Sequence, residues 1–216
     1  MNAVADAAFA RICAAIADDR VAIEPEFLPE SGVRALAAEA GRRDAAGEFR
    51  PARIGRGEER IERPEIRGDR TAWLSESSNV QAEIALRAAL ESLRIELNEE
   101  LFLGLFSFEG HYAIYPPGAF YRRHRDRFRD NDTRVLSCIL YLNEIWTLAD
   151  GGALRIHLEK DVERDVLPIG GTLVCFLADR HEHEVLPASR DRLAISGWFC
   201  RRRPGRGPVF SGSAPV

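Results

Sequence analysis

The chain has 216 residues, of which 45% are hydrophobic and 30% are charged, and its net charge is −4 at neutral pH. This length and composition predict one soluble globular domain large enough to bury a core. The acidic balance argues against nucleic-acid binding, and no apolar run approaches the length of a membrane-spanning helix.

The first half of the chain is predicted to be rich in helices. Residues 1–20 carry no basic leader and place apolar side chains on one stripe, which indicates a helix rather than a signal peptide. Residues 31–45 have the same spacing, and Ser78 with Gln81 resembles a capping box at the start of a third helix. We expect these helices to support a sheet. The third helix presents a stripe formed by Leu86, Leu90, Leu93, Leu97 and Leu101.

The second half changes to the period of short strands. Gly- and Pro-rich turns separate these runs, such as Pro116-Pro117-Gly118 and Gly170-Gly171. Many short strands with such turns predict a sandwich or jelly roll. The strand-like runs lie near residues 105–115, 119–124, 134–142, 152–158, 162–167, 171–177, 183–187 and 192–199.

Two further segments lack a clear period. Residues 47–70 are dense in Arg and Glu, which is typical of a solvated loop and also of a mobile lid or β-hairpin over a binding site. Residues 201–216 begin with Arg201-Arg202-Arg203 and continue with Pro, Gly and Ser, and we expect a flexible tail.

The four cysteines, Cys13, Cys138, Cys175 and Cys200, form no Cys-x-x-Cys pair. The last three fall in strand-like apolar runs, where a reduced cysteine in the core is the ordinary interpretation. This use of cysteine predicts that the protein is located in the reducing cytoplasm.

The pair His124-x-Asp126 indicates a metal site. Residues i and i+2 of a strand point to the same face, so both side chains would lie together. A second histidine from a distant strand would complete a set of two histidines and one carboxylate, which leaves three positions open on Fe(II). Both His181 and His183 have the strand parity for this role, so alternation leaves the choice between them open.

Arg192, Ala194 and Ser196 alternate along the last predicted strand. A guanidinium such as that of Arg192 can donate two parallel hydrogen bonds to a carboxylate. The hydroxyl of Ser196, four residues further on, can reach the same anion. The phenol of Tyr141 is a further donor for that carboxylate, and Tyr115 lies shortly before His124. Core packing remains the alternative for each tyrosine.

Together these residues give the chain a family resemblance. It resembles the 2-oxoglutarate- and Fe(II)-dependent oxygenases, and among them the prolyl 4-hydroxylases of the hypoxia-inducible-factor type with their bacterial relatives. The resemblance covers about residues 27–199 and includes Arg67-Gly68-Asp69 and Trp73. It rests on the ordered motifs Tyr115, His124-x-Asp126, Tyr141-Leu142-Asn143, Gly151-Gly152-x-Leu154-Arg155, His183-Glu184-Val185 and Arg192-x-Ala194-x-Ser196.

The resemblance implies an α+β fold with a double-stranded β-helix (jelly-roll) core buttressed by N-terminal helices. Residues 1–200 would form one domain with a catalytic core at about 105–200 and a mobile loop at about 47–70, which Asp69 would anchor by pairing with Arg134.

The resemblance also implies the site. His124, Asp126 and His183 would bind Fe(II), His183 being selected over His181 by its spacing from the arginine. Arg192 would bind 2-oxoglutarate, helped by Tyr141, Ser196 and Tyr115, and ascorbate would serve as reductant.

The activity implied is that of a 2-oxoglutarate-dependent dioxygenase that hydroxylates the 4-position of a prolyl residue in a protein. A translation factor such as elongation factor Tu is a candidate target. Hydroxylation of free proline or another metabolite is the alternative, and an inactive interaction module is a third. We expect a cytoplasmic monomer that uses dioxygen and binds neither nucleic acid nor membrane.

Overall fold

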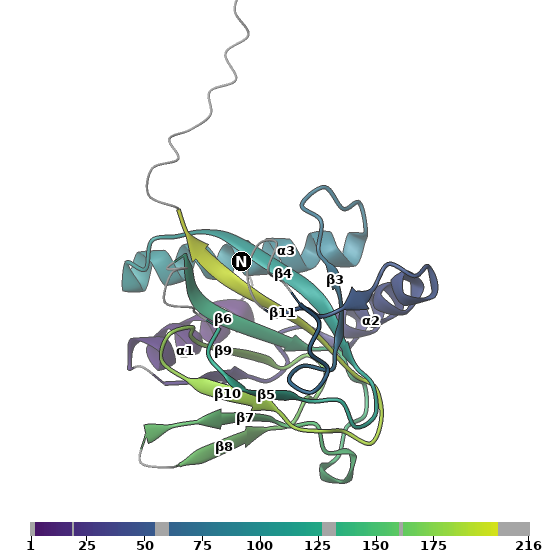
Figure 1. The fold of residues 1–216 in the computed structure, drawn as a ribbon. Coiled ribbons are helices and arrows are strands. Elements are labelled where there is room, and N and C mark those ends of the chain that lie inside the picture. The colour runs from purple at the N-terminus through teal and green to yellow at the C-terminus, as the bar shows by residue number, and fades with distance from the viewer. Residues whose placement is uncertain (1–2, 19, 55–60, 127–132, 160–161, 203–216) are drawn as a thin grey trace, which may run out of the picture.

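The computed structural model describes residues 3–18, 20–54, 61–126, 133–159 and 162–202 (Figure 1). Its helices confirm the helical first half of the prediction. They are α1 (Ala3–Ala17), α2 (Glu30–Ala45) and α3 (Gln81–Leu101). The capping box predicted for α3 is wrong, because the N-cap is Val80 and has no side-chain cap hydrogen bond. The hydroxyl of Ser78 instead accepts a hydrogen bond from the backbone N–H of Val80 at 3.2 Å.

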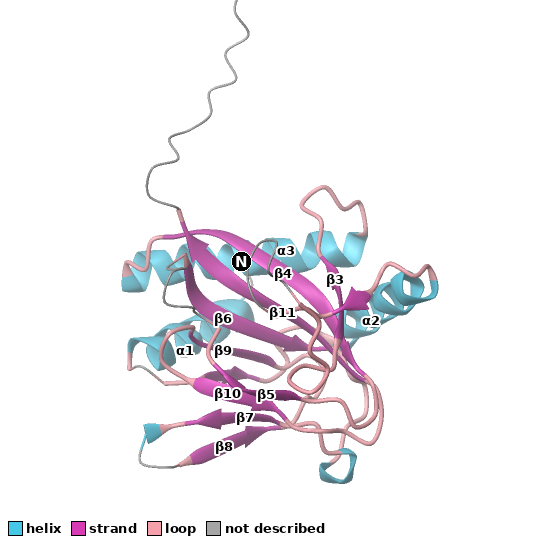
Figure 2. Cartoon of the chain, viewed as in Figure 1, coloured by secondary structure: helices cyan, strands magenta, loops and turns pink. Residues whose placement is uncertain are grey.

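Two antiparallel sheets carry the strands (Figure 2). The larger sheet has the order β1-β9-β6-β11-β4-β3-β2, and the smaller has the order β5-β10-β7-β8. The eight strands expected in the second half are all present. They are β4 (Leu105–Tyr115), β5 (Tyr121–His124), β6 (Arg134–Tyr141), β7 (Leu154–His157), β8 (Glu163–Val166), β9 (Leu173–Leu177), β10 (Glu182–Val185) and β11 (Arg192–Arg201).

Three short strands in the first half were not predicted: β1 (Ala22–Glu24), β2 (Arg50–Pro51) and β3 (Arg70–Trp73). With two to four residues each, they are too short to show a period of their own. They exist because the larger sheet pairs with them: β1 adds to β9, and β3 adds to β4.

The larger sheet separates two buried clusters, and β4 shows how. Tyr112 and Ile114 belong to the cluster between this sheet and the helices. The helices contribute Ile12, Leu36 and Leu93 to that cluster. Ala113 and Tyr115 belong to the cluster between the two sheets, with Leu154, Ile156 and Val185 from the smaller sheet. Alternate residues of a strand point to opposite faces, so the strand serves both clusters at once. Two facing sheets with helices outside the larger one confirm the α+β jelly-roll prediction.

The segment predicted as a solvated loop, a mobile lid or a β-hairpin contains antiparallel pairing. Pro51 and Arg50 in β2 pair with β3, and Ile54 forms an isolated antiparallel bridge with Ile61. Residues 55–60 lie outside the described part of the chain. At the other end, Arg201 still belongs to β11, and its side chain donates to the carbonyl of Leu103 at 2.8 Å. Residues 203–216 of the predicted tail are outside the described residues.

All four cysteines are buried and none forms a disulfide, as expected. The Sγ atoms of Cys138 and Cys175 face each other across β6 and β9 at 3.2 Å. Within the described residues, no helix is both long enough and apolar enough to cross a membrane.

Candidate metal and cosubstrate site

His124, Asp126 and His183 come together at the mouth between the sheets. β5 ends at His124, and β10 lies beside it with His183 directly opposite His124. The three residues each offer a ligand atom within 4.8 Å of the others. Nε2 of His124 lies 3.5 Å from Asp126 Oδ1, and Nε2 of His183 lies 3.6 Å from Asp126 Oδ2. The two nitrogens and the carboxylate therefore converge on one point, as a single ion requires.

Backbone carbonyls orient both histidines toward that point. Nδ1 of His124 lies 2.8 Å from the carbonyl oxygen of Arg122, and Nδ1 of His183 lies 3.3 Å from that of His181. A carbonyl only accepts, so Nδ1 carries the proton and Nε2 keeps its lone pair in the neutral ring. Burial lowers the pKa of His183 to about 4, which keeps that ring neutral. Both Nε2 atoms are thus prepared to coordinate a cation.

The carboxylate of Asp126 is held in its ionised form. Burial alone would raise its pKa, but His183 and His124 beside it hold the pKa of Asp126 well below its usual range. The hydroxyl of Ser137 donates to Oδ2 at 2.7 Å and adds to this effect. A charged carboxylate with two neutral imidazoles is the donor set that suits Fe(II) with open positions.

His181 lies outside this group. Its ring packs edge-on against Phe176 with 6.1 Å between centroids, and it lines a separate hollow next to Arg180. The structure therefore brings together the three predicted ligands and leaves His181 to contribute only its backbone carbonyl.

A small pocket is lined by His124, Asp126 and His183 and also by Arg192. The side chain of Arg192 is buried, with 2% of its surface exposed. Its Nε donates to the carbonyl of Gly152 at 2.8 Å, and its guanidinium lies over the rings of Tyr115 and Tyr141 at 5.3 and 5.1 Å. Its Nη2 has no partner among the described residues. A buried cation needs an anionic partner, so this end of the pocket is built for an acid group.

Tyr141 supplies a second donor at the same place. Its hydroxyl is buried and has no partner among the residues that the structure describes. Burial raises the pKa of Tyr141 to about 12, so the phenol keeps its proton and donates. Ser196 lines the same pocket one register step beyond Ala194, as its strand parity predicted. The unused donors are Nη2 of the Arg192 cation and the hydroxyl of Tyr141, and together they fit the carboxylate of 2-oxoglutarate.

Gly152 makes room for the arginine. Its φ is +68°, and a Cβ there would lie 2.9 Å from the Cβ of Ala188 and 3.3 Å from the Cδ of Arg192. Only glycine fits both this backbone conformation and this close approach.

A cleft of about 480 Å³ reaches Asp126, one of the three predicted metal ligands. Its wall includes Trp73, His111, Tyr121, Arg134 and Trp198, and residues 52–54 of the predicted lid line it as well. The cleft and the pocket that contains Arg192 share Asp126, His111 and Trp198, so the two spaces meet beside a predicted metal ligand.

The predicted pairing of Asp69 with Arg134 is wrong. Asp69 is buried and accepts two hydrogen bonds from Arg67, at 2.6 and 2.8 Å. Arg134 instead pairs with Glu109 at 2.8 Å, and its guanidinium stacks on Trp198 at 3.4 Å. Arg67 lies only two residues from Asp69 and binds both of its carboxylate oxygens, so the buried carboxylate is already satisfied.

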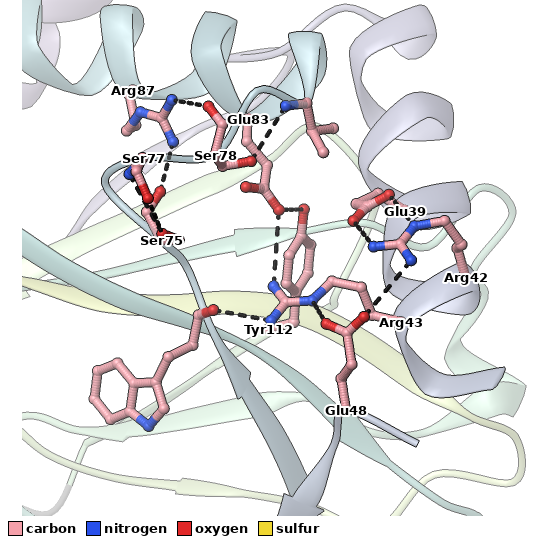
Figure 3. A network of polar contacts seen from close by, with 12 residues as sticks. Glu39, Arg42, Arg43, Glu48, Ser75, Ser77, Ser78, Glu83, Arg87 and Tyr112 are labelled. Carbon is pink, nitrogen blue, oxygen red and sulfur yellow. Dashed lines mark hydrogen bonds and ion pairs between the residues drawn. The ribbon is translucent and has the colours of Figure 1, made fainter. Parts of the chain in front are cut away.

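A polar network behind the cleft fixes the position of Trp73 (Figure 3). Arg43 of α2 donates to the backbone carbonyl of Trp73 at 3.1 Å and to Glu48 at 2.7 Å. The same guanidinium lies 3.8 Å from the buried carboxylate of Glu83 on α3, which accepts a hydrogen bond from Tyr112 of β4 at 3.0 Å. Two helices thereby hold the strand that forms one side of the cleft.

Sequence reasoning missed two contributors to the site. Ser137 binds Asp126, and its signal was a lone hydroxyl in the apolar run of β6. His111 lines both the cleft and the pocket, and its signal was a histidine two residues before Ala113 on the face that also holds Tyr115.

Comparison with known proteins agrees with this geometry. The model of the 2OG-Fe(II) oxygenase superfamily matches residues 110–200. Human Egl nine homolog 1 is 33% identical over 144 residues, which cover 62% of this chain and 33% of that protein. The hypoxia-inducible factor prolyl hydroxylase of Caenorhabditis elegans is 42% identical over 91 residues, which cover 40% of this chain and 12% of that protein. The chain thus spans a third or less of the length of these two relatives.

Two solved structures are similar over nearly the whole chain. A Pseudomonas putida prolyl-4-hydroxylase has 49% identity and a TM-score of 0.82, over 90% of this chain and 100% of that one. A Trichoplax adhaerens prolyl hydroxylase, solved with a peptide fragment of the hypoxia inducible factor oxygen degradation domain, has a TM-score of 0.83. Its identity is 24%, over 91% of this chain and 90% of that one, and it supports the double-stranded β-helix fold.

Proposed function

The chain belongs to the prolyl 4-hydroxylases among the 2-oxoglutarate- and Fe(II)-dependent oxygenases, and from this we propose that it hydroxylates the 4-position of a prolyl residue in a protein. The observation that carries the proposal is the convergence of two imidazoles and one carboxylate beside a buried guanidinium with an unused donor. Such a site joins a metal with open positions to a receptor for an acid cosubstrate.

His124, Asp126 and His183 are the metal ligands in this proposal. The carbonyls that receive their Nδ1–H groups keep both imidazoles in the coordinating tautomer, and Ser137 fixes the carboxylate rotamer. Bound Fe(II) together with 2-oxoglutarate supplies the activation of dioxygen that replaces a substrate hydrogen with a hydroxyl group. The protein contributes ligand geometry and a buried pocket that excludes bulk water.

Arg192 and Tyr141 hold the distal carboxylate of 2-oxoglutarate in this proposal, with Ser196 and Tyr115 beside it. The fit is supported by their unused donors, since Arg192 Nη2 and the Tyr141 hydroxyl are both buried without a partner in the described chain. Binding the carboxylate would satisfy both donors and neutralise the buried cation. The cosubstrate would then point its other end toward Asp126.

A protein substrate is favoured by the cleft. It is open, about 480 Å³ in volume, and lined by residues 52–54 and Trp73 among others. The chain resembles a Pseudomonas putida prolyl-4-hydroxylase, and the Trichoplax relative of similar fold was solved with a peptide. Elongation factor Tu is our candidate target. The proposal also includes ascorbate as reductant and a monomeric state. It includes a cytoplasmic location, which four buried free thiols support.

The test is a turnover assay on the whole chain. Purified protein is mixed with Fe(II), 2-oxoglutarate and either elongation factor Tu or free L-proline, and mass spectrometry reports the gain of one oxygen on proline. We expect oxygen gain and succinate with the protein substrate, and neither with the Asp126→Ala variant. Hydroxylation of free L-proline alone would replace our substrate class with a metabolite. Failure of the protein to bind Fe(II) or 2-oxoglutarate would refute the whole proposal.

A further inference from the structure

His111 is a buried polar side chain that the proposed roles above do not use. It lies on β4, is 2% exposed, and shares its strand parity with Ala113 and Tyr115, which face the space between the sheets. Its backbone neighbours across the sheet are Ser196 of β11 and Trp73 of β3. The imidazole lies between the rings of Trp73 and Trp198, at 4.9 and 5.6 Å between centroids.

The neighbours of the ring determine which nitrogen carries its proton. Nε2 lies 3.4 Å from Nη2 of Arg67, and a guanidinium can only donate, so Nε2 accepts. Burial, with Arg67 adding to it, lowers the pKa of His111 to about 3, so the ring is neutral and its proton lies on Nδ1. Nδ1 is buried and has no partner within the described residues. The ring therefore keeps an N–H donor that the free protein does not use.

The position of His111 points to the substrate as the acceptor. Arg192 lies opposite Tyr115 on the neighbouring strand, four residues from His111 along β4. At about 3.4 Å per residue, Tyr115 and His111 are separated by roughly 14 Å along the strand. The cosubstrate would occupy the Arg192 end. His111 lies where the cleft and the pocket meet, and in the cleft it is accompanied by Trp73 and Trp198.

We propose that His111 is a specificity-determining residue whose Nδ1–H donates a hydrogen bond to a peptide carbonyl flanking the target proline. This inference rests on the proposed function. A buried donor without a partner is unfavourable, and a substrate carbonyl in the cleft would satisfy it. A prolyl residue in a protein has a carbonyl on its amino side that free proline lacks. His111 would thus favour peptidyl proline over the free amino acid.

The test compares N-acetyl-L-prolinamide, which carries both flanking carbonyls, with free L-proline. Binding is measured by ligand-observed NMR on protein loaded with Zn(II) and 2-oxoglutarate, where no turnover occurs. The His111→Phe variant keeps an aromatic ring between the two tryptophans and removes the donor. We expect its Kd for the amide probe to rise about five- to tenfold, as one hydrogen bond predicts, with Kd for 2-oxoglutarate unchanged.

Three further measurements separate a specificity role from a structural one. His111→Gln restores an N–H donor and should recover part of the affinity, whereas His157→Phe, on the smaller sheet away from the cleft, should leave Kd unchanged. The Tm of free His111→Phe protein should stay near that of the wild type, because the variant loses the contact of Nε2 with Arg67 but also removes the unpaired Nδ1–H group. A lowered Tm, or equal binding of the amide by His111→Phe and wild type, would overturn this inference and leave the proposed function standing. If the wild type binds neither probe, both the inference and the proposed protein substrate fail.

Discussion

Replacing Arg192 with methionine gives the most quantitative test of the site. Nε of Arg192 is already used by the Gly152 carbonyl, so the acid group of 2-oxoglutarate would meet the terminal guanidinium nitrogens, of which Nη2 is unused. Truncating one partner of a buried, hydrogen-bonded charge pair costs about 2–5 kcal/mol. We therefore expect Arg192→Met to raise the Kd for 2-oxoglutarate about 30- to 4,000-fold. Arg192→Lys keeps the charge without the planar fork, so its Kd for 2-oxoglutarate should lie between those of the wild type and Arg192→Met.

Calorimetry and thermal unfolding measure this effect independently. At a 2-oxoglutarate concentration of about 100 times the wild-type Kd, binding stabilises the wild type by about 2.7 kcal/mol. For a domain of this size that is a rise in Tm of about 5–10 °C. In Arg192→Met the same concentration should contribute less than about 1 kcal/mol. Arg155→Met, which removes an exterior arginine paired with Asp165, is the control and should behave as wild type. A Kd for Arg192→Met within about threefold of the wild type would refute the assignment of the cosubstrate end.

Three further predictions follow from the site geometry. His183→Ala should abolish iron-dependent turnover while His181→Ala keeps most of it, measured as succinate formed, and the reverse would exchange their roles. Tyr141→Phe should raise the Kd for 2-oxoglutarate about five- to tenfold by calorimetry, because one buried donor is lost; an unchanged Kd would place the carboxylate elsewhere. Gly152→Ala should lower the free energy of unfolding by about 1–3 kcal/mol in urea, because its Cβ would meet that of Ala188 at a positive φ; unchanged stability would show that the turn relaxes.

Much of the fold could be predicted because the relevant signals are local. The strands of the second half alternate or run apolar over four to eleven residues, and turn residues separate them. The parity of Arg192, Ala194 and Ser196 was readable for the same reason, since it depends only on the strand period. Pairing across the sheets could not be read in this way. β1 and β3 exist only because β9 and β4 offer them free edges.

The errors at the site have the same origin. Asp69 was expected to pair with Arg134, but Arg67 lies two residues away and takes both carboxylate oxygens. The competition between two arginines depends on where β3 places each one, and this information is absent from residue spacing. His111 was overlooked because a single histidine in an apolar strand carries no periodic signal; its importance comes from Arg67 and the two tryptophans around it.

The division of β4 between two buried clusters has a consequence for how this protein can change. Tyr112 and Ile114 pack toward the helices, while His111, Ala113 and Tyr115 face the reaction space. A mutational scan along this strand should therefore give two interleaved profiles, with cellular abundance sensitive at the even positions and product yield at the odd ones. Substrate preference can then drift through every second residue while the neighbours between them keep the protein folded. The even positions of this strand thus serve folding alone, whereas the odd positions serve both the site and the core between the sheets.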